Sequence, residues 1–287
     1  MDDSVVEQVR RFSRTVTQRV GALNDHYLSR DRPLGEARVL WEIGADGCEV
    51  RELRARLDLD AGYLSRLLRA LEADDLVTVE PTADDRRVRT ARLTRRGRSE
   101  RAVLDRRSDA LARSLLEPLR EPQQQRLVNA MGEVERLLTA ALVDIDAVDT
   151  ESADAQHCLR AYFAELDDRF DTGFDEHAAL PTDAKVLLVA RLRAEAIGCG
   201  ALKWPTGKVP EIKRMWVAPS ARGLGVGRRL LSELETRARA DGARRIRLDT
   251  NATLVEAIAM YRASGYREIP AYNDEPHASL WFEKRFA

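Results

Sequence analysis

Residues 222–227 read RGLGVG, and this short stretch decides how the second half of the chain is interpreted. It follows PEIKRMWVAPSA (210–221), in which the alternation and bulk of EIKRMWV predict a β-strand. It precedes RRLLSELETRARADG (228–242), whose apolar spacing predicts an amphipathic helix. The stretch is therefore expected to be the turn into a helix N-terminus, where unpaired N–H groups and a partial positive charge favour an anion. Its three alternating glycines leave the backbone uncovered, so that a diphosphate could approach closely.

The spacing of these glycines limits which diphosphate ligand is expected. A dinucleotide fingerprint requires G-x-G-x-x-G, whereas this chain has G-x-G-x-G. A mononucleotide loop requires a following Lys-Ser or Lys-Thr, which is absent here. Taken alone, the stretch is also compatible with a plain tight turn.

The composition of the chain favours two globular domains without a membrane segment. The 287 residues are 44% hydrophobic, which is enough for buried cores. No apolar run approaches the roughly 20 residues of a membrane helix, and the acidic N-terminus does not resemble a signal peptide. We therefore expect a cytoplasmic protein with no membrane partner. Cys48, Cys158 and Cys199 are isolated in the sequence, which indicates reduced thiols and no metal site.

A change of pattern at 142–156 divides the chain. There the helical apolar period is lost, and small and acidic residues become frequent. Before it the pattern is almost entirely helical, and after it β-rich runs alternate with helical ones. We predict one domain at 1–145, a linker at 146–156 and an α/β domain at 157–287.

The first half contains the pattern of a helix-turn-helix followed by a β-hairpin wing. A helix at 50–57 is followed by the turn LDLD and by a second helix that Asp60 is expected to cap. The hairpin is predicted from VTVEP (77–81), the polar tip TADDRR (82–87) and VRTARLT (88–94).

This pattern predicts DNA binding, because a helix N-terminus can enter the major groove and a wing tip can reach phosphates. Eleven arginines and three acidic residues between 86 and 113 give a locally basic surface on a chain of net charge −1. The alternative is a helix-turn-helix that never contacts DNA, with solvated arginines. The candidate DNA-contacting residues are Tyr63, Ser65, Arg66, Arg69, Arg86 and Arg87.

Residues 1–145 resemble the MarR family of winged helix-turn-helix regulators. DDRRVRTARLTRRG (84–97) is similar to the wing signature of that family, an Asp-x-Arg followed by Leu-Thr-x-x-Gly, and DAGYLSRLL (60–68) supports the match. The resemblance implies that Asp85 braces Arg87 at the wing tip. It also implies a homodimer, built from the first and last helices, that binds a palindromic double-stranded DNA site.

Residues 157–287 resemble the GNAT superfamily of N-acetyltransferases. Arg222, Gly225 and Gly227 match the loop pattern of that superfamily, Arg/Gln-x-x-Gly-x-Gly/Ala. RIRLDT (245–250), EAIAMYRASGY (256–266) and SLWFEKRF (279–286) are similar to its later motifs. RAYFAELDDRFDTGFD (160–175) resembles acetyltransferases that are fused to MarR-like domains, so the fusion itself is the expected family.

This resemblance implies acetyl-CoA as co-substrate. The backbone of 223–228 would bind its diphosphate, the end of the strand would pair with its pantetheine amides, and Tyr261 would protonate the departing thiolate. Asn251 is a weaker candidate, because family members often carry Asn at the position of Leu254. The implied coenzyme-binding residues are Met215, Trp216, Val217, Arg222, Gly223, Leu224, Gly225, Val226, Gly227, Arg228 and Asn251.

The acceptor must react as a free amine, so a carboxylate that removes its proton is needed. Glu211 on the strand is the candidate base, with a solvated surface charge as its alternative, and Glu165 is a candidate ligand for the substrate ammonium. We predict a DNA-binding regulator that is also an acetyl-CoA-dependent N-acetyltransferase of a small amine. Two alternatives stay open: a protein lysine as acceptor, or a non-catalytic domain that senses acyl-CoA or an amine.

Overall fold

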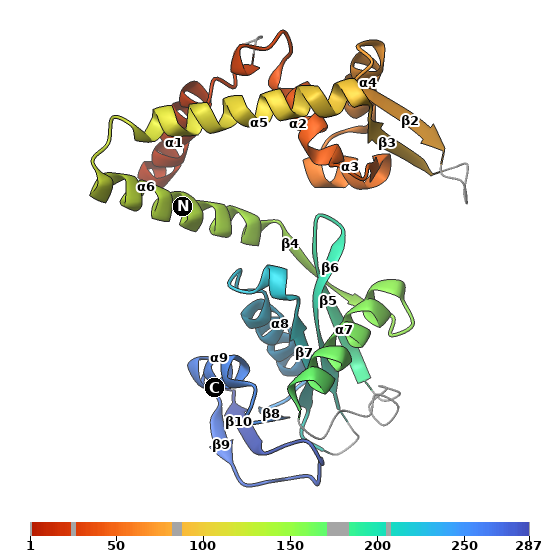
Figure 1. Cartoon of the computed structure of the whole chain (residues 1–287). Coiled ribbons are helices and arrows are strands. Elements are labelled where there is room, and N and C mark those ends of the chain that lie inside the picture. The colour runs from red at the N-terminus through yellow and green to blue at the C-terminus, as the bar shows by residue number, and fades with distance from the viewer. Residues whose placement is uncertain (1, 24–26, 82–87, 171–183, 205–207, 287) are drawn as a thin grey trace. The chain divides into compact units, whose positions relative to one another are not determined.

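A computed structural model describes residues 2–23, 27–81, 88–170, 184–204 and 208–286 (Figure 1). The chain divides into two compact units, Met1–Met131 and Gly132–Ala287. Within the described ranges, no helix has both the length and the apolarity that crossing a bilayer requires.

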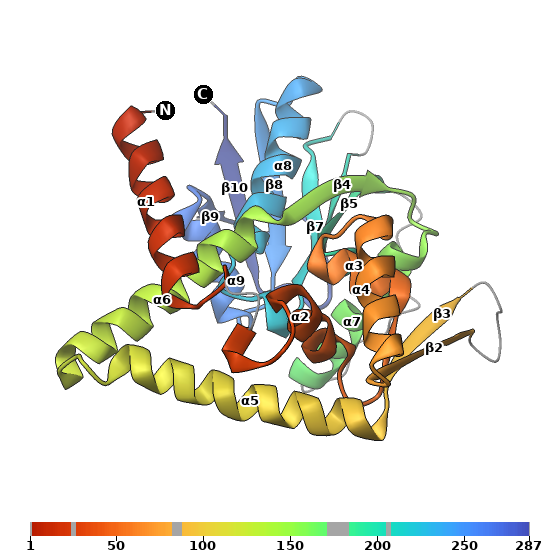
Figure 2. The same ribbon diagram turned by 90° about the horizontal axis from the view of Figure 1, so that it is seen from above.

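The first unit consists of helices and a small sheet with the strand order β1-β3-β2. Figure 2 shows the β2–β3 hairpin projecting beside α4. The elements in chain order are α1 (Asp3–Arg19), a 3-10 turn (Tyr27–Ser29), α2 (Leu34–Ile43), β1 (Cys48–Glu49), α3 (Val50–Leu57), α4 (Ala61–Ala73), β2 (Val77–Pro81), β3 (Arg89–Leu93), α5 (Arg95–Leu116) and α6 (Glu121–Ala141), which ends in the second unit.

Helix α4 begins and packs as its sequence predicts. The Asp60 side chain accepts a hydrogen bond from the Tyr63 backbone N–H at 2.8 Å, which caps the helix. The apolar residues at helical spacing along α4 are buried in the core of the unit, and they are Leu64, Leu67, Leu68 and Leu71. The helix-turn-helix and wing of the predicted fold class are confirmed.

The stretch Thr94–Gly97 fixes the wing to the start of α5. Thr94 Oγ1 accepts from the Gly97 N–H at 2.9 Å and donates to the Asp75 carbonyl at 2.7 Å. A Cβ added at Gly97 would lie 1.9 Å from the Leu76 carbonyl oxygen, so only glycine permits this approach. The Leu-Thr-x-x-Gly pattern therefore has a packing reason in this chain.

The second unit is an α/β unit around a seven-stranded sheet of order β4-β5-β6-β7-β8-β10-β9. Neighbouring strands are antiparallel, except that β7 and β8 are parallel. The strands are β4 (Val143–Val148), β5 (Ala184–Leu192), β6 (Glu195–Lys203), β7 (Glu211–Val217), β8 (Arg245–Thr250), β9 (Arg267–Ile269) and β10 (Leu280–Arg285). The helices are α7 (Ala153–Arg169), the 3-10 turn Pro219–Ala221, α8 (Val226–Ala240) and α9 (Val255–Ala263). The α/β part of the predicted fold class is confirmed.

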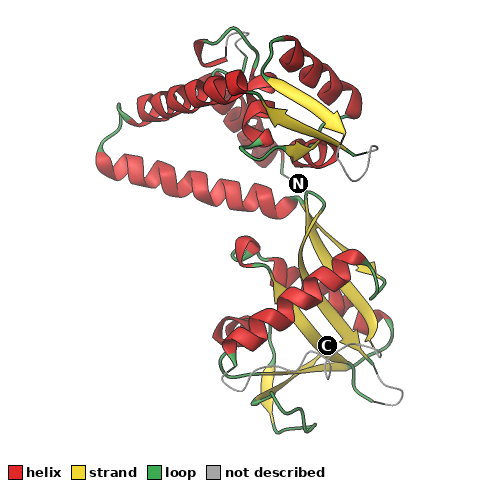
Figure 3. Ribbon diagram, turned by 45° about the vertical axis from the view of Figure 1, so that its right-hand side comes forward, coloured by secondary structure: helices red, strands yellow, loops and turns green. Residues whose placement is uncertain are grey.

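Helices cover both faces of this sheet. Helix α7 packs on one face, with a core that contains Phe163 and Trp216 (Figure 3). Helices α8 and α9 pack on the other face, with a core that contains Leu230, Leu248 and Phe282. The turn between β7 and α8 therefore joins a strand of the sheet to a helix that covers one of its faces.

The structure differs from the predicted linker at 146–156. Strand β4 continues to Val148 and pairs with β5, and α7 starts at Ala153, so only 149–152 join two regular elements. The physical reason is the alternation of Val143, Ile145 and Ala147 with acidic residues, which is a strand period and not the absence of structure.

Candidate functional site

The N-terminal end of α4 presents most of the predicted DNA-contacting side chains. Arg66 and Arg69 are exposed, and Ser65 is half-buried. The Arg66 guanidinium lies 5.6 Å from the centre of the Tyr63 ring, so these two form a pair on one flank of the helix. Arg69 donates to the Ser65 carbonyl and hydroxyl at 3.2 and 3.3 Å on the other flank. Arg86 and Arg87 lie outside the described residues.

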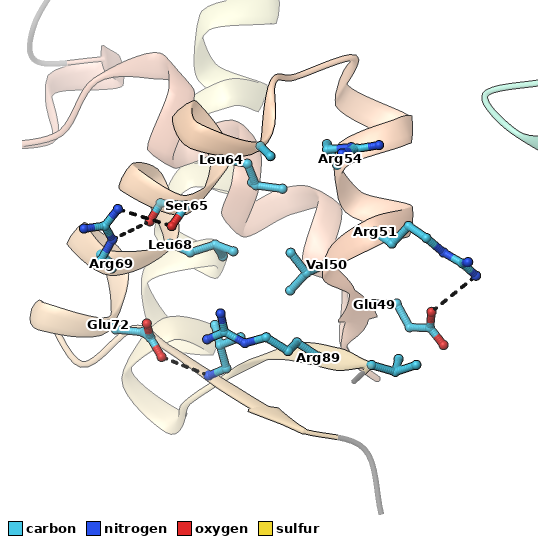
Figure 4. Close-up of a pocket in the computed structure, with 13 residues that line it drawn as sticks. Glu49, Val50, Arg51, Arg54, Leu64, Ser65, Leu68, Arg69, Glu72 and Arg89 are labelled. Atoms are coloured by element: carbon cyan, nitrogen blue, oxygen red, sulfur yellow. Dashed lines mark hydrogen bonds and ion pairs between the residues drawn. The ribbon is translucent and has the colours of Figure 1, made fainter. Parts of the chain in front are cut away.

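A hollow of about 700 Å³ lies between α3, α4 and the β2–β3 hairpin (Figure 4). It brings Ser65 and Arg69 together with three arginines that sequence reasoning missed: Arg51 and Arg54 from α3, and Arg89 from β3. The full lining is Glu49, Val50, Arg51, Arg54, Ala61, Leu64, Ser65, Leu68, Arg69, Glu72, Val79, Val88 and Arg89.

The rim of this hollow is cationic. Four arginines face two glutamates, and Glu72 is occupied because its carboxylate accepts the Val79 N–H at 3.1 Å. In the part of the chain that the structure describes, neither Arg54 nor Arg89 forms an ion pair. A surface of this kind favours phosphate groups. The spacing of the α3 arginines, three residues apart on an exposed face, was the available sequence signal.

The glycine turn before α8 is open. Gly223 and Gly225 have φ of 84° and 78°, the left-handed region, and a Cβ added at either would meet no atom within 4 Å. Gly225 is the N-cap of α8 and offers no side chain to its first turn, unlike Asp60 before α4. Glycine is needed for the conformation, and the space above it is free. The uncapped N–H groups of a 15-residue helix thus face an open cradle that suits an anion.

Strands β7 and β8 separate next to this turn. They pair only through Glu211 with Arg247 and Ile212 with Leu248, although β7 continues to Val217. Strand β7 also carries a bulge against β6, where Arg214 has a φ of 54°. The backbone from residue 213 onward therefore has an edge toward β8 that the sheet does not use. Met215 and Val217 lie there half-buried, and Trp216 is buried against α7.

Tyr261 on α9 is buried beside the turn. A Cβ at Gly227 would lie 3.1 Å from the sulfur of Met260, the residue before Tyr261, so α9 packs directly on the start of α8. Burial, and secondarily the charge of Asp249, raise the pKa of Tyr261 far above its ordinary value of 10. No hydrogen bond to its hydroxyl is found among the described residues. The phenol is therefore protonated at neutral pH, and none of the described residues is its hydrogen-bond partner.

The candidate base Glu211 belongs to a charged cluster at the point where the two strands separate. The Lys213 ammonium lies 2.5 Å from Asp249, 3.6 Å from Glu211 and 3.8 Å from Glu275. Tyr272 also donates to Asp249, at 3.3 Å. Asp249 and Glu275 were not predicted, because only the folded chain brings their separate segments to Lys213.

The other predicted site residues have partners within the chain. Glu165 on α7 accepts from Arg222 at 2.6 Å and from the Trp216 indole at 2.9 Å. Asn251 donates to the His277 carbonyl at 2.8 Å, and its oxygen accepts from Thr253. Among the turn residues, Leu224 is half-buried, Val226 is buried and Arg228 is exposed. Within the described ranges, no cluster of three or more His, Cys, Asp or Glu side chains forms a metal site.

Comparison with known proteins found one family-model match in each half of the chain. Residues 147–266 match the family model described as the acetyltransferase (GNAT) family, and residues 31–88 match that of the MarR family. An IAA acetyltransferase of Azospirillum brasilense is 42% identical over 101 residues, which cover 34% of this chain and 65% of that protein. The uncharacterized N-acetyltransferase YjgM of Escherichia coli (strain K12) is 33% identical over 84 residues, 28% of this chain and 50% of that protein.

Among solved structures, FabT of Streptococcus pneumoniae in complex with DNA aligns with 47% of this chain and 96% of its own, at 17% identity and a TM-score of 0.40. The matched part of this chain spans 65% of the length of the Azospirillum brasilense relative and 50% of that of the Escherichia coli relative.

Proposed function

Because the chain joins a MarR-family region to a region of the acetyltransferase (GNAT) family, we propose that it is a DNA-binding regulator that also transfers an acetyl group from acetyl-CoA to a small amine. The observation that carries the second activity is the open glycine turn before α8, next to the separation of β7 and β8. We expect the protein to act in the cytoplasm.

The residues of the turn fit the diphosphate of acetyl-CoA. The backbone N–H groups of 223–228 hold it, because no side chain caps them and no Cβ of Gly223 or Gly225 fills the space above them. The free edge of β7 at Met215–Val217 then accepts the pantetheine amides, as an added strand would. Bound there, acetyl-CoA supplies a thioester-activated acetyl group.

Two residues handle the protons in this proposal. Tyr261 gives its proton to the departing thiolate, and burial raises the proton affinity of that thiolate as it does that of the phenol. Glu211, which lies 3.6 Å from the Lys213 ammonium that also pairs with Asp249, accepts the proton of the acceptor ammonium directly or through water. Without such a base, an alkylammonium of pKa about 10.4 carries a handicap of about 4–5 kcal/mol at neutral pH.

The test is acetyl transfer from acetyl-CoA across a panel of amines. Tyr261→Phe is expected to abolish most turnover while leaving CoA binding intact. Tyr266→Phe is the matched control, since Tyr266 is another buried tyrosine whose ring lies 5.9 Å from that of Tyr261. Equal turnover by Tyr261→Phe and the wild type would remove the phenol from the mechanism.

For DNA, we propose that the start of α4 enters the major groove. Tyr63, Ser65 and Arg66 then lie at base edges, and Arg69 with the arginines of the hollow contacts phosphates. Arg86 and Arg87 are proposed to contact the DNA from the wing, as the resemblance to the MarR family implies. If about six phosphates are neutralised, log K falls with log salt at a slope of roughly −5. A slope near zero in a fluorescence titration with duplex DNA would contradict this interface.

The partner across the palindrome is proposed to be a second copy. Helix α1 buries no residue, yet Val5, Val9, Phe12 and Val16 form a stripe along it, with 50%, 59%, 46% and 38% exposure. Helix α6 likewise exposes Val128, Met131, Leu137 and Leu138. Stripes of this size on two helices are typical of a surface that is covered in a dimer.

A second candidate function is favoured by one contact of α8. Arg229, in the first turn of α8, donates to the carbonyls of Ala140 and Val143 at 2.8 and 2.7 Å. It thereby ties the start of α8 to the C-terminal end of α6. Because α6 begins in the first unit, this contact favours a regulator whose second unit senses acyl-CoA. Operator affinity measured with and without acetyl-CoA tests it, and identical binding curves exclude sensing of that ligand.

A further inference from the structure

Glu165 contacts several elements around the proposed coenzyme site, and the sequence alone does not predict these contacts. Both carboxylate oxygens accept from the Arg222 guanidinium at 2.6 Å, and Arg222 Nε donates to the Val217 carbonyl at 3.2 Å. The Trp216 indole N–H donates to the same carboxylate at 2.9 Å. Helix α7, the end of β7 and the first residue of the glycine turn therefore meet at one side chain.

A second arginine extends this network to the helix of the proposed general acid. Arg169, one turn after Glu165 on α7, lies 2.9 Å from the Glu165 carboxylate and 3.5 Å from Glu256 in the first turn of α9. Tyr261 is on the same helix α9. One carboxylate with 22% exposure thus has three donors and connects α7, through them, with the end of β7, the glycine turn and α9.

We propose that Glu165 is a positioning residue for the coenzyme and not a ligand of the acceptor ammonium. It acts through Arg222 and Trp216, which hold the glycine turn and the edge of β7 in the geometry that the diphosphate and the pantetheine amides need. An acceptor ammonium would have to displace two guanidinium groups and an indole N–H from this carboxylate. The inference rests on the proposed acetyl-CoA site.

The donor and acceptor sides of the reaction give opposite expectations for Glu165→Gln. If Glu165 positions the turn, the affinity for CoA falls about tenfold, as expected when charge-assisted hydrogen bonds are lost. The KM for the acceptor amine then stays unchanged. If Glu165 binds the acceptor, the acceptor KM rises and the affinity for CoA is unaffected.

The experiment is calorimetric titration of CoA into the full chain without acceptor, followed by acetyl transfer kinetics. Asp168→Asn is the matched control, because Asp168 is an exposed carboxylate on the same helix three residues further along. Glu165→Asp keeps the charge and is expected to restore part of the affinity. Arg222→Met combined with Glu165→Gln is expected to bind CoA no more weakly than the worse single variant, because both remove the same contact.

The outcomes separate this inference from the proposed function. Loss of CoA affinity in Glu165→Gln, with the control like the wild type, supports the positioning role. If the CoA affinity of Glu165→Gln is within about twofold of the wild type, the positioning role is overturned, because twofold corresponds to less than about half a kilocalorie per mole. The proposed coenzyme site is not affected by that result. A wild-type chain that does not bind CoA overturns both.

Discussion

The conformation of Gly225 makes a quantitative prediction about the proposed coenzyme site. Gly225 has a φ of 78°, and a Cβ added there meets no atom within 4 Å. In Gly225→Ala the strain of a left-handed alanine costs about 1–2 kcal/mol of stability, and no steric clash adds to it. For a unit of this size that corresponds to a fall in Tm of roughly 2–8 °C.

The same methyl group has a second effect only if the turn binds CoA. It would stand beside the N–H groups that are proposed to hold the diphosphate, so one or two charge-assisted hydrogen bonds are lost. We expect the affinity for CoA to fall by about 1.5–3 kcal/mol, roughly tenfold to hundredfold in Kd. Calorimetric titration with CoA measures this, and thermal unfolding measures the strain.

Gly242 is the matched control at the other end of α8. Its φ is 90°, and an added Cβ also meets no atom within 4 Å. Gly242→Ala is expected to lower Tm as much as Gly225→Ala and to bind CoA as the wild type does. Equal CoA affinity in the two variants would refute the reasoning, because the loss would then follow from strain alone or not occur.

Three further predictions concern the first unit. Arg54→Gln is expected to weaken operator binding and to reduce the slope of log K against log salt by about 0.9. The control Arg113→Gln on α5 is expected to change neither, and DNA titrations at a series of salt concentrations measure both. Phe12→Glu places a charge in the apolar stripe of α1 and is expected to shift the protein to monomers in sedimentation velocity, so an unchanged dimer would move the interface elsewhere. Gly97→Ala is expected to lower the free energy of unfolding by about 3 kcal/mol in chemical denaturation, because the added Cβ meets the Leu76 backbone. Its control is Gly132→Ala in an open part of α6, at the start of the second unit, which is expected to raise that free energy by up to about 1 kcal/mol.

The sequence predicted those parts of the fold that depend on neighbouring residues. The Asp60 cap, the leucine stripe of α4 and the turn at 222–227 are local patterns, and their elements form as expected. The predicted linker at 146–156 overlaps strand β4, because the alternation of acidic and small apolar residues there is a strand period that composition alone does not show.

The missed parts of the candidate sites depend on contacts that are distant in the sequence. Asp249 is 36 residues from Lys213, and Arg222 is 57 residues from Glu165. A single sequence contains each of these charges but does not show which charges become partners, so the guanidinium neighbours of Glu165 cannot be predicted from it. The arginines of the hollow are of the same kind, because α3 and β3 meet only through tertiary packing.

Arg229 offers a physical link between the two proposed activities of the chain. Its guanidinium donates to the carbonyl of Ala140 at the C-terminal end of α6, and Arg229 lies in the helical turn that is proposed to bind the diphosphate. Helix α6 begins at Glu121 and carries part of the exposed apolar surface that is proposed for the dimer. We therefore expect a ligand that moves the start of α8 to act on α6, a helix that begins in the first unit. Since coupling requires an element that both sites bias, Arg229→Gln is expected to separate CoA binding from any change in operator affinity while leaving each binding event in place.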